Sequence, residues 1–385
     1  ITGGSVSGDV YGGYTAGSGK TTGNKVTLGD GTGPLAAAIN GTLYGGSDNN
    51  DVTGNTLEVN DNATAKNIKN FDTIAFHLNN NNNASAAMLT LNGGTVTDGL
   101  DWKKLTVDPM HLNGVGTKSY EAFSRTLIEN ANGLKFDKGG SDTYDKVGAR
   151  SEQTTTHEYV IDTDNHTGNA NKAILSGYQF KDNTAATYKA TDGTHDEAWG
   201  GRSIIGNRVE NNTLTVDGGT LNKGTYGGLV ENNKRDASGN KLTTGDAVKN
   251  TLVLKAGSTT ANAFGAEVRT KDGKAEENTV TMEGGTVNGK LAGGTLAAEN
   301  AKGNATKNRV TIKDGTVTGD LYGGYLEKAT ATGSAKDNTV TIEGGTMNDV
   351  YGGYTAGNGK TTGNIVNLGS GNAALASGTT LGILH

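Results

Sequence analysis

Residues 308–325 read NRVTIKDGTVTGDLYGGY, and the alternation of side chains in this stretch decides the fold. Val310 and Ile312 alternate with threonine, which is the pattern of a strand with one apolar face. An Asp-Gly turn follows, and a second short segment with Val317 and Leu321 ends at a Tyr-Gly-Gly corner. Short strands joined by glycine corners are typical of one coil of a β-helix.

The same unit recurs along most of the chain. Its opening asparagine is found at Asn24, Asn55, Asn212, Asn250, Asn278, Asn308, Asn338 and Asn364. From the third of these onward the intervals are 38, 28, 30, 30 and 26 residues, so the unit accepts insertions at one corner. Repeats of roughly 20–50 residues mark solenoids, propellers or arrays, whose units must stack to bury their apolar faces. We therefore expect an all-β chain forming one right-handed parallel β-helix, with coils about 4.8 Å apart.

Two features of the unit leave structural alternatives open. The opening asparagines are either turn residues with a left-handed backbone or members of a stacked amide ladder. In the last copy of the unit, the inward candidates Met347 and Val350 are three residues apart, whereas their counterparts elsewhere are four apart. A bulge or an altered corner is expected there.

A second stretch, DVYGGYTAGSGKTTGN at residues 9–24, contains GSGKTT and looks like a nucleotide-binding phosphate loop. The spacing is wrong, because Tyr14 occupies the position that needs the first glycine of that motif. Residues 349–364 repeat the stretch with one change, Asn358 in place of Ser18. The stretch is therefore a repeat element, and nucleotide binding is not expected.

Composition excludes several classes of function. The chain has 385 residues, no cysteine, 34 Lys and Arg, and 40 Asp and Glu, for a formal net charge of −6. Without a basic cluster, neither nucleic acid nor an anionic membrane is an expected partner. No apolar run is long enough to span a bilayer, so no membrane insertion by this chain is expected. The chain opens inside a repeat without a signal peptide, which suggests a piece of a longer protein.

The repeat pattern predicts one elongated domain with three parts: β-helix coils at 1–99, an irregular insertion packed on the side of the solenoid at 100–205, and β-helix coils at 206–385. Within the insertion, SYEAFSRTLIENANG (119–133) has apolar residues at helical spacing and predicts one short helix. The segments EYVID (158–162) and AILSGYQF (173–180) predict strands.

The sequence offers no catalytic or metal-binding constellation. The histidines have no regular ligand spacing, and neither IDTDNH (161–166) nor HDE (195–197) matches a known site. GGSDTYDKV (139–147) is only faintly similar to a calcium-binding glycine-aspartate repeat and occurs once. The G-x-S-x-G nucleophile motif is also missing. We expect no cofactor, no metal and no enzymatic activity.

Two specific functions can be compared with the residues that the coils offer on their outer faces. β-Helical enzymes that degrade polysaccharides, lyases or hydrolases, concentrate carboxylates and basic residues on one strand face, whereas the coils here offer mainly Thr, Asn, Gly and Tyr. Release of reducing ends or unsaturated products from polysaccharides would identify such an enzyme. A row such as Thr281, Thr311 and Thr341 also suits an ice-binding surface, which altered ice-crystal shape would reveal.

The repeat also carries a resemblance to a known family. The units NTVTIEGGTMNDVYGGYTAGNGKTTGNIVNL (338–368) and NRVTIKDGTVTGDLYGGY resemble passenger domains of Gram-negative autotransporter adhesins. NIKNFDTIAFHL (67–78) is similar to an N-F-x-x-I phrase in the coils of that family. The resemblance covers roughly residues 1–98 and 207–385.

Membership of that family would imply a passenger secreted through a C-terminal outer-membrane barrel and either displayed on the bacterial surface or released. The lack of cysteine agrees with this route, because a disulfide-closed loop would obstruct passage of an unfolded chain. The functions implied are bacterial aggregation, biofilm formation or attachment to host surfaces.

Two sets of aromatic residues are candidates for adhesive contact. Rows of corner tyrosines, among them Tyr11, Tyr322 and Tyr351, suit a side-by-side contact with an identical molecule on another cell. The middle segment offers aromatic anchors for a host protein or glycan: Trp102, Tyr178, Tyr188 and Trp199. These four residues are alternatively a small core beneath the insertion. Self-association is favoured, because most of the chain is regular solenoid.

Overall fold

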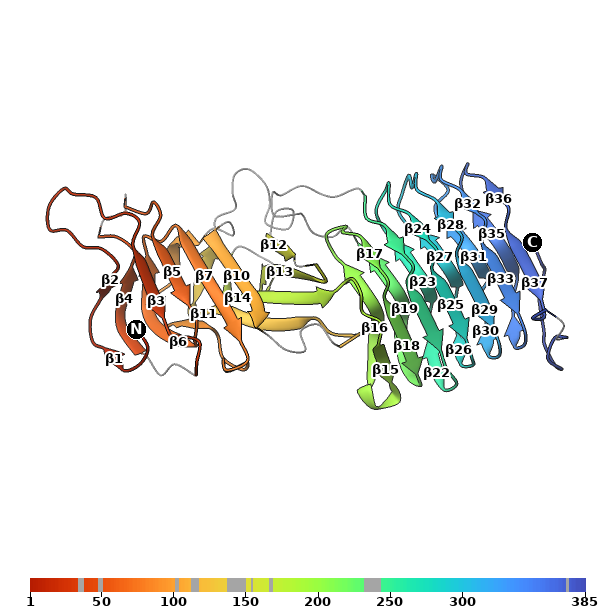
Figure 1. Cartoon of the computed structure of the whole chain (residues 1–385), viewed down its shortest axis with the longest axis horizontal. Helices are drawn as coiled ribbons and strands as arrows, with labels where there is room; N and C mark the ends of the chain where they lie inside the picture. Colours follow the sequence, from red (N-terminus) through yellow and green to blue (C-terminus); the bar gives the residue numbers. More distant parts are fainter. Residues whose placement is uncertain are drawn as a thin grey trace.

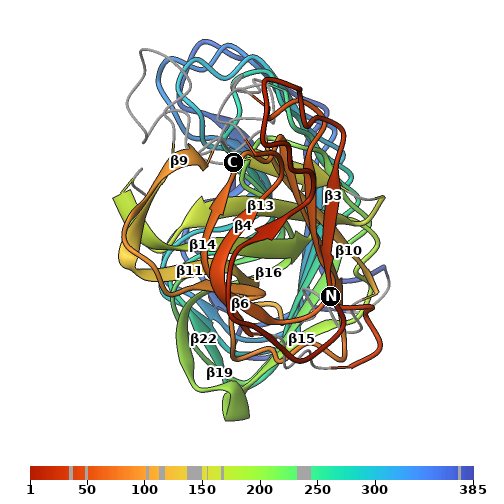
Figure 2. The same cartoon turned by 90° about the vertical axis from the view of Figure 1, so that its left-hand side faces the viewer.

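The chain forms an elongated β-solenoid. The computed structural model describes residues 1–33, 38–47, 51–100, 104–111, 118–136, 150–153, 155–165, 169–231, 244–371 and 374–385. Strands of successive coils pair in parallel, and two stacks of coils lie at the two ends of the molecule (Figure 1). Seen from the N-terminal end, the strands of the second stack lie behind those of the first (Figure 2). The fold class predicted from the repeat is confirmed.

The N-terminal stack is built from two sheets around one core. Sheet A contains β1 (Ser5–Val6), β2 (Val10–Tyr11), β4 (Ala38–Tyr44), β6 (Ala63–Lys69), β8 (Leu89–Leu91), β9 (Val96–Leu100), β11 (Phe123–Phe136), β12 (Arg150–Gln153), β13 (His157–Thr163) and β14 (Asn169–Gln179). Sheet B contains β3 (Lys25–Leu28), β5 (Thr56–Val59), β7 (Thr73–Asn79) and β10 (Leu105–His111). Side chains such as Leu57 and Phe76 are fully buried between the two sheets.

The C-terminal stack has three sheets, so a typical coil supplies strands to each in turn. Sheet C contains β17 (Val209–Glu210), β20 (Ala247–Val248), β24 (Ala275–Glu276), β28 (Ala305–Thr306), β32 (Ala335–Lys336) and β36 (Thr361–Thr362). Sheet D contains β15 (Ala186–Lys189), β18 (Thr213–Asp217), β21 (Thr251–Leu254), β25 (Thr279–Met282), β29 (Arg309–Ile312), β33 (Thr339–Ile342) and β37 (Ile365–Leu368). Sheet E contains β16 (Thr194–Ser203), β19 (Gly219–Val230), β22 (Ser258–Thr260), β23 (Ala263–Val268), β26 (Thr286–Val287), β27 (Leu291–Leu296), β30 (Thr316–Val317), β31 (Leu321–Leu326), β34 (Thr346–Met347) and β35 (Val350–Thr355). A single 3-10 turn, η2 (Ala190–Asp192), joins β15 to β16.

The aliphatic positions of the repeat point inward, as the alternation predicts. Val310 and Ile312 lie in the core, and the threonine between them is half-buried on the outer face. In the last unit Met347 pairs with Val317 and Val350 pairs with Leu321, and both Met347 and Val350 are buried. The register therefore shifts by one residue between these two pairs, which confirms the predicted irregularity.

The opening asparagines form a ladder of buried side-chain amides. From Asn212 to Asn364, each Nδ2 donates to Oδ1 of the next asparagine at 2.9–3.1 Å. The same Oδ1 accepts the backbone N–H of the preceding asparagine, and Nδ2 also donates to a carbonyl oxygen, such as Asn308 Nδ2 to Ala275 O at 3.0 Å. The ladder alternative is thus confirmed. The left-handed turn residue is instead the one before each asparagine, for example Lys307 with φ 55°.

A pair of glycines in sheet E makes room for this ladder. At the first glycine, a Cβ would come within 3.0 Å of the carbonyl oxygen of the next coil, and this holds at Gly200, Gly227, Gly265, Gly293 and Gly323. At the second glycine, such as Gly324, a Cβ would meet the amide group of a ladder asparagine, here Asn338. The Gly-Gly pair of the repeat therefore leaves the space that the ladder asparagine and the backbone of the next coil occupy.

The predicted helix at 119–133 is wrong. Residues 123–136 form β11, which pairs in parallel with β8 and β9 and antiparallel with β14. The register with β14 shifts between Thr126 and Ile128, so the adjacent Leu127 and Ile128 are both buried. This bulge breaks the two-residue period and gives the apolar residues a spacing that imitates a helix.

The middle of the chain is more regular than its sequence predicts. Strands β11 to β14 continue sheet A, with β12, β13 and β14 antiparallel to their neighbours, and do not lie on the side of the solenoid. The two predicted strand segments are confirmed as β13 and β14. Strands β15 and β16 pair with β18 and β19, so regular coils resume at residue 186, before the expected boundary at 206.

Candidate functional site

The outer face of sheet D is a flat array of threonines in register. One row runs through Thr213, Thr251, Thr279, Arg309 and Thr339, and a second through Thr215, Val253, Thr281, Thr311 and Thr341. Except for the exposed Arg309, these side chains are half-buried by their neighbours above and below. The array repeats because the parallel register places the same position of each unit side by side.

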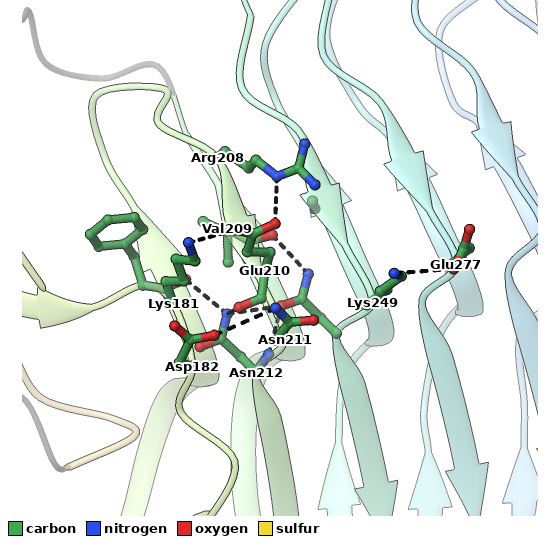
Figure 3. A network of polar contacts seen from close by, with 12 residues as sticks. Lys181, Asp182, Arg208, Val209, Glu210, Asn211, Asn212, Lys249 and Glu277 are labelled. Atoms are coloured by element: carbon green, nitrogen blue, oxygen red, sulfur yellow. Dashed lines mark hydrogen bonds and ion pairs between the residues drawn. The ribbon is translucent and has the colours of Figure 1, made fainter. Parts of the chain in front are cut away.

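Charged residues of alternating sign border this array near the start of four of its strands, β21, β25, β29 and β33. Lys249, Glu277, Lys307 and Asp337 occupy the left-handed corner immediately before the ladder asparagine, with φ between 55° and 56°. All four side chains are exposed. Lys249 Nζ reaches Glu277 Oε2 at 3.9 Å, and Figure 3 shows this pair on adjacent coils. We name these four residues the corner column.

A second alternating set borders the array at the other end of the strands. It consists of Asp217, the last residue of β18, and of Lys255, Glu283, Lys313 and Glu343, each directly after a sheet D strand that is in register with the next. Lys255 Nζ lies 3.5 Å from Asp217 Oδ2, and Lys313 Nζ lies 3.2 Å from Glu283 Oε1. We name these five residues the end column.

The two columns carry the same sign on the same coil. Lys249 and Lys255 make one coil positive, Glu277 and Glu283 make the next negative, and the pattern continues to Asp337 and Glu343. The face is therefore banded in charge across its full width. We name the threonine array with both columns the banded face.

Stability alone does not account for this alternation. The side chains of the pairs Lys249–Glu277, Lys255–Asp217 and Lys313–Glu283 are 41–59 % exposed. Exposed ion pairs of this kind contribute about 0–1 kcal/mol each. The left-handed corner would also be less strained with glycine, which occurs there at Gly363. The charges therefore matter more for the contacts that the face can make with a partner than for the stability of the coil.

A denser cluster joins the first coils of the C-terminal stack (Figure 3). Glu210 accepts Lys181 at 2.9 Å and Arg208 at 2.6 Å. The hydrogen bond from Lys181 is the main cause that lowers the pKa of Glu210, with Arg208 adding to it. Next to it, Asn211 Nδ2 donates to Asp182 Oδ1 at 3.4 Å. These contacts hold the first coils of the C-terminal stack together. The corner column lies on the coils that follow.

Sequence reasoning missed the banded face. Successive bands are about 30 residues apart in the sequence, and each charge looks like a solvated loop residue on its own. Alignment of the units that begin at Asn250, Asn278, Asn308 and Asn338 would have found them, because the residue before each asparagine and the residue five after it alternate in sign from unit to unit. The row of Thr281, Thr311 and Thr341 named from the sequence lies on this face.

The corner tyrosines form the rows that the repeat predicts, on sheet E in the C-terminal stack and on sheet A in the N-terminal stack. Tyr322 stacks on Tyr351 with ring centroids 5.1 Å apart, and Tyr11 stacks on Tyr44 at 4.7 Å. Tyr322 is buried, Tyr351 is half-buried and Tyr11 is 39 % exposed. Most of the row in the C-terminal stack therefore holds neighbouring coils together and offers little surface to a partner.

The aromatic residues of the middle segment do not form an exposed anchor. Tyr188 is fully buried inside the C-terminal stack, and Trp199 is 6 % exposed on sheet E. Half-buried Tyr178 packs edge-on against Trp199 at 5.8 Å, with Arg202 over both rings. Tyr178 and Trp199 thus pack together on sheet E, Tyr188 belongs to the separate interior core of the stack, and Trp102 lies outside the described residues.

A buried carboxylate joins the middle of the chain to the C-terminal stack. Glu158 Oε2 accepts Ser203 Oγ at 2.7 Å and Asn207 Nδ2 at 2.9 Å, and Oε1 accepts the N–H of Ile204 at 3.1 Å. Burial raises the pKa of Glu158 above its ordinary value, although these three hydrogen bonds oppose the shift.

This joint should make stability depend on pH. The folded pKa of Glu158 lies above the unfolded value of about 4.3, so its stabilising contribution relative to Gln is greatest below that pH. The contribution should fall as pH rises from there through the folded pKa. We expect the melting temperature of wild type minus that of Glu158→Gln to decrease from pH 4 to pH 8. Calorimetry tests this, with Glu129→Gln as control, since the Glu129 side chain is 37 % exposed; an increasing difference would contradict it.

The histidine segments do not form a cluster of metal ligands in the described ranges. His195 stacks near Tyr120 at 4.3 Å, and its Nε2 is 2.9 Å from the carbonyl oxygen of Asp192. His166 and the segment 139–147 lie outside those ranges. Among the residues that the structure describes, no three His, Asp or Glu side chains gather as metal ligands.

None of the helices in the described part of the chain has the length and apolar character needed to cross a membrane. No family model, curated protein or solved structure matches this chain.

Proposed function

We propose that the chain is a non-enzymatic adhesive module of a bacterial cell surface that binds a second copy of itself through the banded face. The alternating sign of the corner and end columns is the observation that carries this proposal. The surface location and the secretion route come from the resemblance of the repeat to autotransporter passengers.

The order of charges makes the banded face complementary to itself. A half-turn about an axis in the plane of the face, perpendicular to the solenoid and between the coils of Glu277 and Lys307, brings these two residues opposite each other. The same rotation brings Lys249 opposite Asp337. In the end column it brings Lys255 opposite Glu343 and Glu283 opposite Lys313. Each of these four pairs occurs twice by symmetry, which makes eight ion pairs.

Two symmetric dimers can form through this face, one with antiparallel and one with parallel solenoids. Only the antiparallel dimer brings opposite charges together. A two-fold axis parallel to the solenoid would place the corner column of one molecule opposite the end column of the same coil in the other, so that like charges meet across the whole face. Antiparallel pairing is also the orientation of two molecules that extend from facing cells. The threonine rows then meet one another between the two lines of ion pairs.

The expected strength of one such contact is modest. Eight exposed pairs at about 0.2–1 kcal/mol each amount to roughly 2–8 kcal/mol before the cost of association. Many copies on two cells would multiply weak contacts into firm adhesion. Because the attraction is between exposed charges, salt should weaken it.

Charge reversal tests the proposal. In Glu277→Lys/Glu283→Lys, four of the eight pairs become like-charge contacts, so we expect self-association to weaken at least about tenfold. Adding Lys307→Glu/Lys313→Glu restores opposite signs across the two-fold axis and should restore association. Analytical ultracentrifugation at low and high salt measures the purified chain, and settling of cells that display the full protein measures adhesion.

The matched control is Glu58→Lys/Glu129→Lys, which changes net charge equally but lies in the N-terminal stack. It should associate like wild type. The proposal is wrong if the control and the face variant weaken association equally, or if the four-residue exchange fails to restore it. A chain that stays monomeric at all concentrations in low salt, with no settling of cells, would also overturn it.

A further inference from the structure

A polar hollow lies at one corner of the N-terminal stack, away from the banded face. It occupies about 560 Å³ and is lined by Asp30, Gly31, Asn60, His77, Asn79, Asn80 and Asn81. These residues lie at or just beyond the ends of β3, β5 and β7, which are neighbours in sheet B. Its volume is within the range of about 300–1,000 Å³ for small-molecule sites.

The hollow exists because the corners here differ from those of the C-terminal stack. There a strand of sheet D ends in a tight turn such as Asp314-Gly315, whereas here β7 runs into five consecutive asparagines, 79–83. Asn82 is buried and accepts the N–H of Asn79 at 2.8 Å, which turns the chain. Asn80 and Asn81 are exposed at the rim.

The walls of the hollow are held in place by their own backbone contacts. Asn60 Nδ2 donates to Gly29 O at 3.1 Å, Asn79 Nδ2 to Asn60 O at 3.1 Å, and Asn81 Nδ2 to Gly31 O at 3.3 Å. Asp30 Oδ1 accepts both the N–H and the hydroxyl of Thr32, at 3.0 and 2.6 Å. Polar groups fixed before a ligand arrives reduce the entropy cost of binding it.

The chemistry of the lining restricts the ligand. Side-chain amides both donate and accept, which matches hydroxyl groups, and the Asp30 carboxylate accepts two hydrogen bonds as adjacent hydroxyls can donate. Among the residues that the structure describes, none that lines the hollow is Lys or Arg, so an anion would meet the Asp30 carboxylate without a compensating cation. In the same described lining there is no aliphatic side chain and the His77 imidazole is the one ring, so an apolar ligand would bury polar groups without partners.

We propose that this hollow binds a neutral oligosaccharide, with Asp30 and the amides of Asn60, Asn79, Asn80 and Asn81 contacting its hydroxyl groups. Through this site the chain would attach to a glycan surface, in addition to the self-association proposed above. Glycan binding at the hollow does not depend on that self-association. His77, whose Nδ1 is 3.9 Å from Asp108 Oδ2, forms one side wall and would contribute a further polar group.

The test measures binding of neutral hexose oligosaccharides, and of sialylated forms of the same oligosaccharides, to the purified chain on an array and by calorimetry. Wild type should bind neutral forms and discriminate against sialylated ones. Asp30→Asn keeps an acceptor for Thr32 but removes the charge, and Asn80→Ala removes a rim amide. Together they should weaken binding about tenfold or more.

The control is Asp314→Asn/Asn288→Ala, which makes the same two changes at exposed positions of the C-terminal stack. It should bind as wild type, and melting curves should show that both variants are folded. The proposal fails if no neutral oligosaccharide binds at millimolar concentration, if sialylated or peptide ligands bind instead, or if Asp30→Asn/Asn80→Ala binds unchanged. Self-association of the Asp30 variant, measured in parallel, separates this outcome from failure of the banded face.

Discussion

Asn308→Leu is expected to lower the free energy of unfolding by roughly 3–9 kcal/mol, because about three buried polar groups lose their partners at about 1–3 kcal/mol each. Asn308 Oδ1 accepts both the N–H and Nδ2 of Asn278 at 3.0 Å. Its own Nδ2 donates to Asn338 Oδ1 at 2.9 Å and to Ala275 O at 3.0 Å. A domain is stable by only about 5–15 kcal/mol, so much of the C-terminal stack should unfold.

Chemical denaturation followed by circular dichroism measures this loss. The matched control is Asn304→Leu, the same change at an exposed asparagine of the same coil, which should cost less than about 1 kcal/mol. If Asn308→Leu were no less stable than Asn304→Leu, the amide ladder would not hold the coils in register.

Gly323→Ala is the second change for which we expect a large effect. The added Cβ would come within 3.0 Å of the carbonyl oxygen of Gly352, a backbone atom that cannot rotate away. The coils would have to separate locally and stretch the hydrogen bonds between β31 and β35. We expect a loss of about 1–3 kcal/mol or more, the range of overpacked cores.

Gly324→Ala separates this effect from the general cost of adding a methyl group. The equivalent position of β23 is already Ala266, which is in register with Gly294 and, through it, with Gly324. A Cβ at this second position meets the side chain of Asn338, which can shift. If Gly323→Ala and Gly324→Ala were equally stable in urea unfolding, the contact with the carbonyl oxygen of Gly352 would not be the cause of the lost stability.

The coils could be predicted from the sequence because their determinants are local. Val310 and Ile312 alternate with threonine within a few residues, and the unit then recurs, so both the strand and its stacking can be deduced from a single chain. The irregular unit at Met347 and Val350 was predictable for the same reason. A difference of one residue between two copies of a repeat has few structural solutions.

Contacts between distant residues were harder to predict. The helical spacing of 119–133 follows from a bulge at Leu127, which depends on pairing with β14 about 50 residues away. The sequence permits both a ladder and a left-handed turn for the asparagines, because nothing near Asn308 in sequence shows that it faces Gly294. The banded face required the register of all coils, since its partners are neighbours only in the stack.

The asparagine ladder also has a consequence for how the solenoid is polarised. Every side-chain amide from Asn212 to Asn338 donates in the same direction along the axis, so the amide dipoles are aligned head to tail. Each dipole strengthens the next, and the hydrogen bonds become cooperative in a medium of low dielectric constant. An interruption at Asn278 would divide the row into two short segments, whereas one at Asn338 would leave most of it intact. The cost of the same substitution should therefore rise toward the centre of the row.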